Sequence, residues 1–400
     1  MRSVEEHLSH VLRLGQRLEA EPSGIGDGAG RVLAEDLSAR VAVPPFDNSA
    51  MDGFAVRARD LSAGRLLKVV GDIPAGARSL PEVRVGETAR IMTGAPMPPG
   101  ADAVVPVELT DQPLGSAPLP AVVQVREPVK VGRHVRRAGE DIVAGEVGLR
   151  AGLVWGPAAA SAAASLGYSE VPLIRRPKVA VLATGTELAP AGEPLGPGQI
   201  PDSNSWLLSG LIRQFGAQLH LVRTVPDEPE EFAVALRKAG EADLVVTTGG
   251  VSVGAFEVVR QVTEGEIEFV KVAMQPGKPQ ASGRLLASDG RRVPMLALPG
   301  NPVSVFVSAW VFLRPLIAVL AGRDPRVETF EAVAATGWSG PVDRCQHIPV
   351  TLTSQGAQPL HRLGSGSHLV ASLAMAEALA VVPVGVAEVR AGDRVTCFRV

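Results

Sequence analysis

The segment from residue 177 to residue 325 alternates short, continuously apolar runs with amphipathic stretches, and this alternation strongly limits the folds open to it. The runs PKVAVLA, QLHLVRTV, ADLVVTT, IEFVKVA and VPMLALP are typical of strands that are buried on both faces. The stretches between them have the helical spacing of apolar residues, and the longest covers 302–321. Alternating strands and helices build a doubly wound, mostly parallel α/β sheet. The turn Ser288-Asp289-Gly290 predicts one hairpin before the last strand.

The rest of the chain has a different pattern of residues. The 43 glycines and 33 prolines exceed the roughly 12% share that the two residues usually have together, and they cluster as turns between short β-like runs at 44–145 and beyond Arg323. Ser3 and Glu6 have the spacing of a capping box at the start of a helix. We therefore expect a multidomain α/β plus β protein with these parts: an N-terminal helical and extended domain (1–43 plus 146–175), an inserted β-rich domain (44–145), an α/β domain (176–325) and a small C-terminal β-barrel (326–400).

Composition excludes several classes of function. A formal net charge of −3 argues against a protein that binds nucleic acid mainly through electrostatics. Two cysteines, Cys345 and Cys397, supply neither a disulfide framework nor a structural zinc site, which favours a reducing, cytoplasmic compartment. The N-terminus does not resemble a secretory signal, and the apolar stretches 151–167 and 309–321 are too short or interrupted to span a membrane. We expect a soluble protein with no nucleic-acid or membrane partner.

Chemically useful residues follow each predicted strand of the α/β domain, and ligands bind at the carboxyl ends of such strands. Glu187 follows the first strand and Asp227 follows the second. Lys278 follows the fourth strand and lies between a glycine and a proline. The loops TTGGVSVG, QPGKP and LPGNPVS supply the expected substrate-binding residues: Gly249, Gly250, Ser252, Gly277, Pro299, Gly300, Asn301, Pro302 and Ser304.

These loops are suited to an anion. Glycine allows the backbone to approach a ligand closely, and helix N-termini present free N–H groups. TTGGVSVG is neither a dinucleotide fingerprint nor a Walker A loop, because its glycine spacing differs and no GK[ST] follows. Each feature alone has an ordinary explanation, as a tight turn, a helix start or a surface charge. Together, carboxylates, an ammonium group and anion-binding loops fit a Mg²⁺-bound phosphate ester.

The β-rich domain carries a second group of polar residues. The segment PPFDNSAMDGFAV (44–56) contains Asp52, RIMTGAP contains Thr93, and VRRAGED ends at Asp141. Ordinary turn chemistry and a charge-balanced surface loop are the alternative interpretations. The polar loop 364–368 suggests no chemistry by itself.

These segments together resemble the molybdopterin molybdenumtransferase family, which includes the bacterial MoeA proteins and the E domain of gephyrin. The similarity runs essentially end to end and rests on collinear motifs: FDNSAMDGFAV, RIMTGAPMP, RRAGEDI, ATGTEL, the Asp202-Ser203-Asn204 step, TTGGVSVG, QPGKP, LPGNPVS and the Gly366-Ser367-His368 turn. The resemblance implies an elongated homodimer of four-domain subunits with a crevice between the α/β domain of one subunit and the β domain of the other. It also implies the last step of molybdenum cofactor synthesis, in which adenylylated molybdopterin and molybdate react with Mg²⁺ to give the loaded cofactor and AMP.

The resemblance also implies roles for individual residues. Asp52, Asp141 and Lys278 fall on catalytic positions and Thr93 on a substrate-binding position. Glu187, Asp227 and Glu257 fall on or near the positions expected to hold Mg²⁺. Two positions depart from the family pattern: Glu257 stands where an aspartate is usual, and Gln275 where a lysine is usual.

Two other functions remain open at this point. One is the adenylylation of molybdopterin, which related single-domain enzymes perform, although the additional β-rich domains argue against that reaction. The other is a dimeric scaffold with a vestigial site, for which Glu257 and Gln275 are the only support in the sequence. The resemblance also suggests transient contacts with other proteins of cofactor synthesis.

Overall fold

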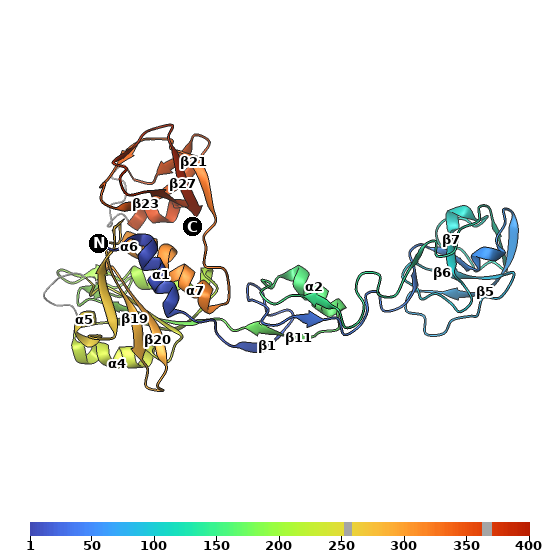
Figure 1. The fold of residues 1–400 in the computed structure, drawn as a ribbon, viewed down its shortest axis with the longest axis horizontal. Coiled ribbons are helices and arrows are strands. Elements are labelled where there is room, and N and C mark those ends of the chain that lie inside the picture. Colours follow the sequence, from blue (N-terminus) through green and yellow to red (C-terminus); the bar gives the residue numbers. More distant parts are fainter. Residues whose placement is uncertain (252–257, 362–369) are drawn as a thin grey trace. The chain divides into compact units, whose positions relative to one another are not determined.

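The computed structural model describes residues 1–251, 258–361 and 370–400 (Figure 1). The chain folds into two compact units, which we describe separately. Unit 1 comprises residues 1–21, 30–34 and 172–400, and unit 2 comprises residues 22–29 and 35–171.

Unit 1 is built on a six-stranded sheet with the strand order β15-β12-β16-β20-β19-β17. Its strands are β12 (Lys178–Thr184), β15 (Gln218–Val225), β16 (Leu244–Thr248), β17 (Ile267–Lys271), β19 (Pro279–Leu286) and β20 (Arg292–Leu298). Strands β15, β12, β16 and β20 are parallel neighbours, whereas β19 pairs antiparallel with both β20 and β17. The expected hairpin before the last strand is confirmed by the β19–β20 pair.

Helices cover both faces of this sheet. They are α1 (Val4–Leu14), α3 (Asn204–Gln214), α4 (Pro229–Ala239), α5 (Val258–Val262), α6 (Pro302–Ser308), a π-helical turn η3 (Ala309–Leu313) and α7 (Arg314–Leu320). Successive residues of β12 enter different cores: Val181 packs with residues of α1, α3 and α6, and Leu182 packs with residues of α4 and α5. The central strands are therefore buried on both faces, as their apolar sequences predict.

The outer strands differ from the sequence-based expectation. In β15 the first seven residues are exposed or half-buried, and in β17 only Ile267 is buried. Both strands lie at an edge of the sheet, where fewer neighbouring elements cover them. Apolar residues in the runs QLHLVRTV and IEFVKVA thus reflect partial burial.

Helix α1 begins with the expected capping box between Ser3 and Glu6. Its apolar side contributes Val4 and Val11 to the same core as α3 and α7. The structure therefore groups residues 1–21 with the α/β sheet, whereas the sequence had suggested grouping them with 146–175. An amphipathic stripe shows that a helix packs against a core but does not specify which core.

The helical segment Pro302–Leu320 is long and apolar enough to cross a membrane, but 89% of its most apolar window is buried inside the protein. It is the central helix of the unit 1 core, with Leu313, Leu316 and Ile317 fully or almost fully buried. Its apolar character is accounted for by packing.

The C-terminal part of unit 1 is a second sheet with the order β18-β23-β25-β27-β21 and β24 paired to β23. Its strands are β18 (Met274–Gln275), β21 (Thr329–Val333), β23 (Cys345–Thr353), β24 (Gly356–Pro359), β25 (Ala378–Val382) and β27 (Arg394–Arg399). Strand β18 comes from the QPGKP segment and pairs parallel with β23, so the second sheet helps to fix that loop. Cys345 and Cys397 are free and buried.

Unit 2 contains a five-stranded sheet with the order β7-β4-β6-β5-β8. Its strands are β4 (Gly53–Val56), β5 (Arg65–Ile73), β6 (Glu87–Ile91), β7 (Ala103–Pro106) and β8 (Val122–Val125). Phe54 and Val105 lie in the core on one side, and Ile73 and Ile91 lie in the core on the other.

Short elements complete the chain. The two-stranded sheets are β1 (Ala20–Gly24) with β11 (Glu170–Ile174), β2 (Leu37–Ser38) with β10 (Val147–Leu149), β3 (Asn48–Ser49) with β9 (Val135–Arg136), β13 (Leu188–Ala189) with β14 (Ile200–Pro201), and β22 (Trp338–Ser339) with β26 (Glu388–Val389). The remaining helices are α2 (Pro157–Ser165), η1 (Ala58–Asp60), η2 (Val107–Leu109) and η4 (Val370–Met375).

Candidate active site

Asp52 and Thr93 form a fixed pair in unit 2. Ser49 exchanges backbone hydrogen bonds with the turn at 94–95: its amide donates to the Ala95 carbonyl (3.0 Å), and its carbonyl accepts from the Gly94 amide (2.8 Å). This pairing brings Asp52 next to Thr93, so that Asp52 Oδ1 accepts from the Thr93 amide (2.6 Å) and the Thr93 hydroxyl (2.8 Å). These two bonds, of which the one from the amide has the larger effect, hold the pKa of Asp52 below its ordinary value, although burial opposes them slightly.

Glycine is required next to this pair. A Cβ atom at Gly53 would lie 2.1 Å from the carbonyl oxygen of Val105, a distance at which the strands would have to move apart. Gly94, directly after Thr93, has φ +79°, a conformation that side-chain-bearing residues rarely adopt. The D-G and T-G steps are therefore needed to place the carboxylate and the hydroxyl together.

Among the other polar residues of the segment 44–56, Asp47 accepts from Arg137 Nη1 (2.6 Å) and from the Ala138 amide (2.8 Å), whereas Asn48 and Ser49 make local turn contacts. The Asn48 side chain donates to the Phe46 carbonyl (3.1 Å), and the Ser49 hydroxyl donates to the Met51 carbonyl (2.5 Å). The Asp141 amide donates to the Val43 carbonyl (3.0 Å), which fixes its loop. The Asp141 side chain is exposed, and within unit 2, which is described throughout, its carboxylate makes no hydrogen bond or ion pair.

In unit 1, a hollow of about 270 Å³ lies at the carboxyl ends of β12, β16 and β20. Five of the predicted site residues line it: Glu187, Gly249, Gly300, Asn301 and Pro302. Gly249 has φ +88°, and a Cβ atom there would lie 2.6 Å from the Thr184 carbonyl oxygen. A Cβ atom on Gly250, with φ +64°, would lie 2.5 Å from Val259. The two glycines let the loop after β16 turn directly against β12 and the start of α5.

The loop after β20 leads into the central helix as expected. Pro302 occupies the first helical turn, and Asn301 is the N-cap residue with extended backbone angles, although its side chain makes no capping bond to the helix. Pro299 and Ser304 are buried beneath the loop. Asn301 and Pro302 therefore border the hollow at the N-terminus of α6.

Sequence reasoning assigned no role to Asn204, which also lines this hollow. Its side-chain nitrogen donates to the Gly300 carbonyl (2.6 Å), and its Oδ1 is buried without a hydrogen-bond donor among the residues that the structure describes. The preceding Asp202 is fully engaged, because it accepts from the Ser205 amide and hydroxyl and from the Thr224 hydroxyl. The sequence gives no signal for this contact, because a polar run such as Asp202-Ser203-Asn204 before a helix ordinarily indicates capping.

The predicted carboxylate ligands are only partly brought together. Glu187 lines the hollow, whereas Asp227 Oδ2 accepts from the amide (3.2 Å) and hydroxyl (3.3 Å) of Thr186 and so joins the loops after β12 and β15. Ser252 and Glu257 lie outside the described residues. Within 1–251, 258–361 and 370–400, no group of three or more His, Cys, Asp or Glu side chains could hold a metal ion.

Lys278 lies at the same edge of the sheet. Because Ala281 pairs with Ala297, the antiparallel register carries Lys278 to the end of β20, where Pro299 begins the next loop. The loop is held by Gly277, which has φ +101° and accepts from the Gln280 side chain (2.8 Å). The Lys278 side chain is half-buried, and its ammonium group has no hydrogen bond or ion pair with the described residues.

A guanidinium group lies beside position 275. Gln275 Oε1 accepts from Arg344 Nη1 (3.0 Å), and strand β18 itself pairs with β23 at Gln346. The Arg344 guanidinium, which also forms an ion pair with Asp343 (3.5 Å), therefore lies close to the QPGKP loop.

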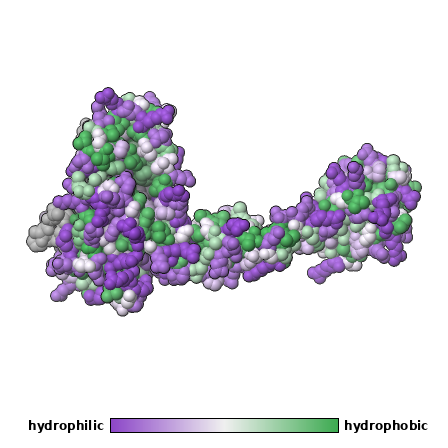
Figure 2. Space-filling view, viewed as in Figure 1, coloured by the Kyte–Doolittle hydropathy of each residue, from purple (hydrophilic) through white to green (hydrophobic). Residues whose placement is uncertain are grey.

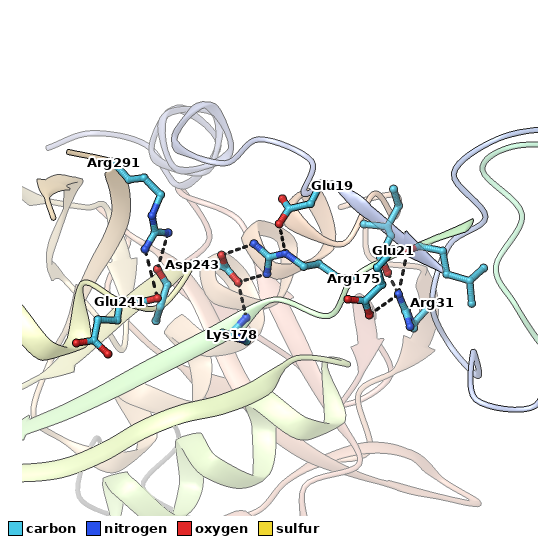
Figure 3. A network of polar contacts seen from close by, with 11 residues as sticks. Glu19, Glu21, Arg31, Arg175, Lys178, Glu241, Asp243 and Arg291 are labelled. Atoms are coloured by element: carbon cyan, nitrogen blue, oxygen red, sulfur yellow. Dashed lines mark hydrogen bonds and ion pairs between the residues drawn. The ribbon is translucent and has the colours of Figure 1, made fainter. Parts of the chain in front are cut away.

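A larger hollow of about 1170 Å³ lies at the opposite, amino edge of the unit 1 sheet, but its charges are mostly paired within the protein (Figure 3). Arg175 donates to both oxygens of Asp243 (2.6 and 2.7 Å) and to Glu19. Burial alone would raise the pKa of Asp243, but the bonds from Arg175 and from the Lys178 amide hold it below its ordinary value. Arg291 donates to backbone carbonyls at 240–242. This network fastens the N-terminal segment to the sheet.

Family models match nearly the whole chain. A model of the MoeA N-terminal region (domain I and II) matches residues 2–167, one described as a probable molybdopterin binding domain matches 180–319, and one of the MoeA C-terminal region (domain IV) matches 331–398.

Curated proteins and solved structures agree with these matches. Molybdopterin molybdenumtransferase 2 of Mycobacterium tuberculosis is 40% identical over 98% of this chain and 98% of its own length. The molybdopterin molybdenumtransferase of Haemophilus influenzae is 36% identical over 94% of this chain and 93% of its own length. A crystal structure of a molybdopterin biosynthesis MoeA protein of Pyrococcus horikoshii has a TM-score of 0.84 and 30% identity, and covers 99% of this chain and 98% of its own chain.

Proposed function

Because this chain belongs to the molybdopterin molybdenumtransferase family, whose members are transferases of molybdenum cofactor biosynthesis, we propose that it inserts molybdate into adenylylated molybdopterin with Mg²⁺ and releases AMP. The observation that carries the proposal is the hollow at the carboxyl ends of β12, β16 and β20. There two glycine-containing loops and the start of the central helix meet beside a carboxylate, and such a place suits a phosphate-bearing ligand.

The described donors fit Mg²⁺. Glu187 offers a carboxylate in the hollow, and the buried Asn204 Oδ1 offers an oxygen that has no hydrogen-bond donor in the described part of the chain. Mg²⁺ in proteins is typically held by one or two carboxylates, with phosphate and water oxygens completing the shell, so a larger protein cage is not needed. Asp227 and Glu257 are the further ligands that we propose. When bound, the ion would neutralise charge on the diphosphate link of the substrate.

The chain's own groups would position the rest of the substrate. Backbone N–H groups near Gly249 and Gly300, with the start of the helix at Pro302, favour the phosphates of the adenylate. Lys278 would hold phosphate or molybdate oxygens as a point charge, and Arg344, next to Gln275, would supplement it. Gly250, Gly277, Pro299, Asn301 and Ser304 would shape these loops, and Ser252, which lies outside the described residues, is a further proposed substrate-binding residue.

Asp52 would act from the β-rich domain as an ionised acceptor held by Thr93. Its second oxygen, Oδ2, makes no hydrogen bond within unit 2 and is available to a ligand. Together with Asp141, it would orient the pterin or act on the incoming oxyanion.

We also propose the finer architecture that the resemblance implies: a homodimer of four-domain subunits, with an inserted β-rich domain and a C-terminal β-barrel. Exposed apolar side chains support a subunit interface near α2, where Figure 2 shows green areas on the surface. These side chains are Val41, Val143, Val147, Leu153 and Val154. A cytoplasmic location and transient contacts with other proteins of cofactor synthesis belong to the same proposal.

The function is tested with purified protein, adenylylated molybdopterin, molybdate and Mg²⁺, by measuring AMP. We expect Asp52→Ala and Lys278→Ala each to abolish AMP release, while Lys238→Ala, which removes an exposed lysine of α4, leaves it unchanged. Near wild-type turnover in both site variants would reject the assignment. Consumption of ATP with unmodified molybdopterin would favour the adenylyl-transfer alternative, and absence of any turnover would favour a scaffold.

A further inference from the structure

A third hollow, of about 360 Å³, opens beside Asp52 within unit 2. One side is the sheet, where Phe54 of β4 pairs with Arg90 of β6. The other side is the segment 112–120, which has no helix or strand and lies mostly exposed to solvent. The function proposed above uses Asp52 but assigns nothing to this hollow.

A single arginine fixes the outer wall of the hollow. Arg90 Nη1 donates to the Ala117 carbonyl (2.7 Å), while Nε (2.9 Å) and Nη2 of the same guanidinium donate to the two oxygens of Asp72. Within unit 2, this bond to Ala117 is the only hydrogen bond that fastens residues 113–120. The hydrogen bonds from Arg90 also hold the pKa of Asp72 below its ordinary value, so the guanidinium is kept in place by a charged partner.

The lining of the hollow selects one kind of ligand. Met92, Val107, Pro113 and Pro118 present apolar surface, which suits the faces of a flat ring. Asp52 at one end is ionised, accepts bonds from Thr93 only at Oδ1, and keeps Oδ2 for a donor. The one cation in the lining, Arg90, is already paired with Asp72. An anionic group such as phosphate or molybdate would meet a carboxylate without an available cation.

A ring whose edge carries adjacent N–H and NH₂ donors matches this lining. The 2-amino-4-oxo pyrimidine edge of a pterin has that arrangement, whereas the amino group of adenine stands beside an acceptor nitrogen that a carboxylate would repel. We propose that this hollow binds the pterin ring of the substrate, with Asp52 Oδ2 accepting from its N–H groups and Arg90 as a positioning residue for the outer wall. This inference rests on the proposed function, because it presupposes a molybdopterin substrate.

The binding test uses the full chain and two probes, 6-hydroxymethylpterin and adenosine, in titration calorimetry. Ser116→Trp places an indole into the hollow from an exposed position, and Leu114→Trp adds the same bulk at a neighbouring exposed residue that does not line it. We expect Ser116→Trp to weaken pterin binding at least tenfold and to leave adenosine binding within twofold, while Leu114→Trp changes neither. Three results would overturn the inference. The wild type does not bind the pterin, or Ser116→Trp binds it as the wild type does, or Ser116→Trp loses adenosine binding while it retains pterin binding.

The positioning role of Arg90 is tested by kinetics. Arg90→Ala frees the 113–120 segment but leaves Asp52 and Thr93 untouched, so KM for adenylylated molybdopterin should rise about tenfold with kcat within twofold. Arg90→Lys keeps a positively charged donor group but loses the planar fork of the guanidinium, and it should give a smaller rise in KM. A fall in kcat with unchanged KM would contradict positioning of the ring. The pterin titration needs no turnover, so the two proposals can fail separately. Pterin binding without AMP release rejects only the proposed function. AMP release without pterin binding rejects only the pterin site.

Discussion

Replacing Gly249 by alanine tests the close approach of loops at the carboxyl edge of the unit 1 sheet. Gly249 has φ +88°, and an added Cβ would lie 2.6 Å from the Thr184 carbonyl oxygen and 2.9 Å from its hydroxyl. Gly198 provides a matched control, because it has φ +78° but nothing lies within 4 Å of an added Cβ. The two substitutions therefore share the backbone strain and differ in the steric clash.

The expected magnitudes follow from that difference. Alanine in the left-handed region costs roughly 1–2 kcal/mol at either position. The clash at Gly249 forces Thr184 and the end of β12 to shift, which adds about 1–3 kcal/mol, the usual range for overpacking in a packed interior. Effects on the unfolded chain are the same for both variants and cancel in the comparison. Gly249→Ala should thus lose about 2–5 kcal/mol of local stability, and Gly198→Ala about 1–2 kcal/mol.

The assay is native-state hydrogen exchange of peptides that cover 178–184 and 244–248, combined with AMP release. Gly249→Ala should speed exchange in both peptides and raise KM for the adenylylated substrate, because the loop borders the hollow. Gly198→Ala should leave exchange in these strands and the kinetics near wild type. Equal effects of the two substitutions would refute the view that close backbone approach shapes this site.

Other predictions follow from single contacts. Thr93→Val should raise the pKa of Asp52, because a hydrogen bond that favours the carboxylate is lost. In a pH profile of kcat/KM, the activity that requires ionised Asp52 should then decrease at a higher pH than in the wild type. Identical acidic limbs in the two profiles would contradict this. Arg175→Ala leaves the buried Asp243 carboxylate without its ion-pair partner and should lower the free energy of unfolding by about 3 kcal/mol in urea denaturation at pH 7. A loss under about 1 kcal/mol would show that water replaces Arg175 as the partner of Asp243. Glu187→Gln should raise the Mg²⁺ concentration needed for half-maximal AMP release by about tenfold or more. Glu193→Gln, at an exposed position between β13 and β14, should leave that concentration unchanged. Equal Mg²⁺ curves for Glu187→Gln and the wild type would remove Glu187 from the metal site.

The central strands and their loops were open to prediction because their signals are local. The middle residues of strands β12, β16 and β20 are apolar, and a strand covered on both faces needs that composition. The glycines at 249–250 and the Asn301-Pro302 step mark where those strands turn into helices. Since the carboxyl ends of neighbouring parallel strands lie at the same edge of the sheet, the residues that follow them can be predicted to lie close together.

Other features depend on contacts that spacing does not encode. Asp52 and Thr93 meet only because the turn at 94–95 pairs with Ser49, a tertiary contact between separate motifs. The position of Asn204 in the site cannot be predicted from the sequence, because its bond to the Gly300 carbonyl joins two loops that each have the sequence of an ordinary helix start. Which core receives helix α1 is likewise decided by packing, through Val4 and Val11.

The most direct test of the proposed function is the stoichiometry of one reaction. Purified protein, adenylylated molybdopterin, molybdate and Mg²⁺ are mixed without ATP, and AMP and metal-loaded cofactor are quantified together. We predict equal amounts of AMP and loaded cofactor, with no AMP when either molybdate or Mg²⁺ is omitted and none from Lys278→Ala. AMP release that is independent of molybdate, or loaded cofactor formed by Lys278→Ala at the wild-type rate, would contradict the proposed function.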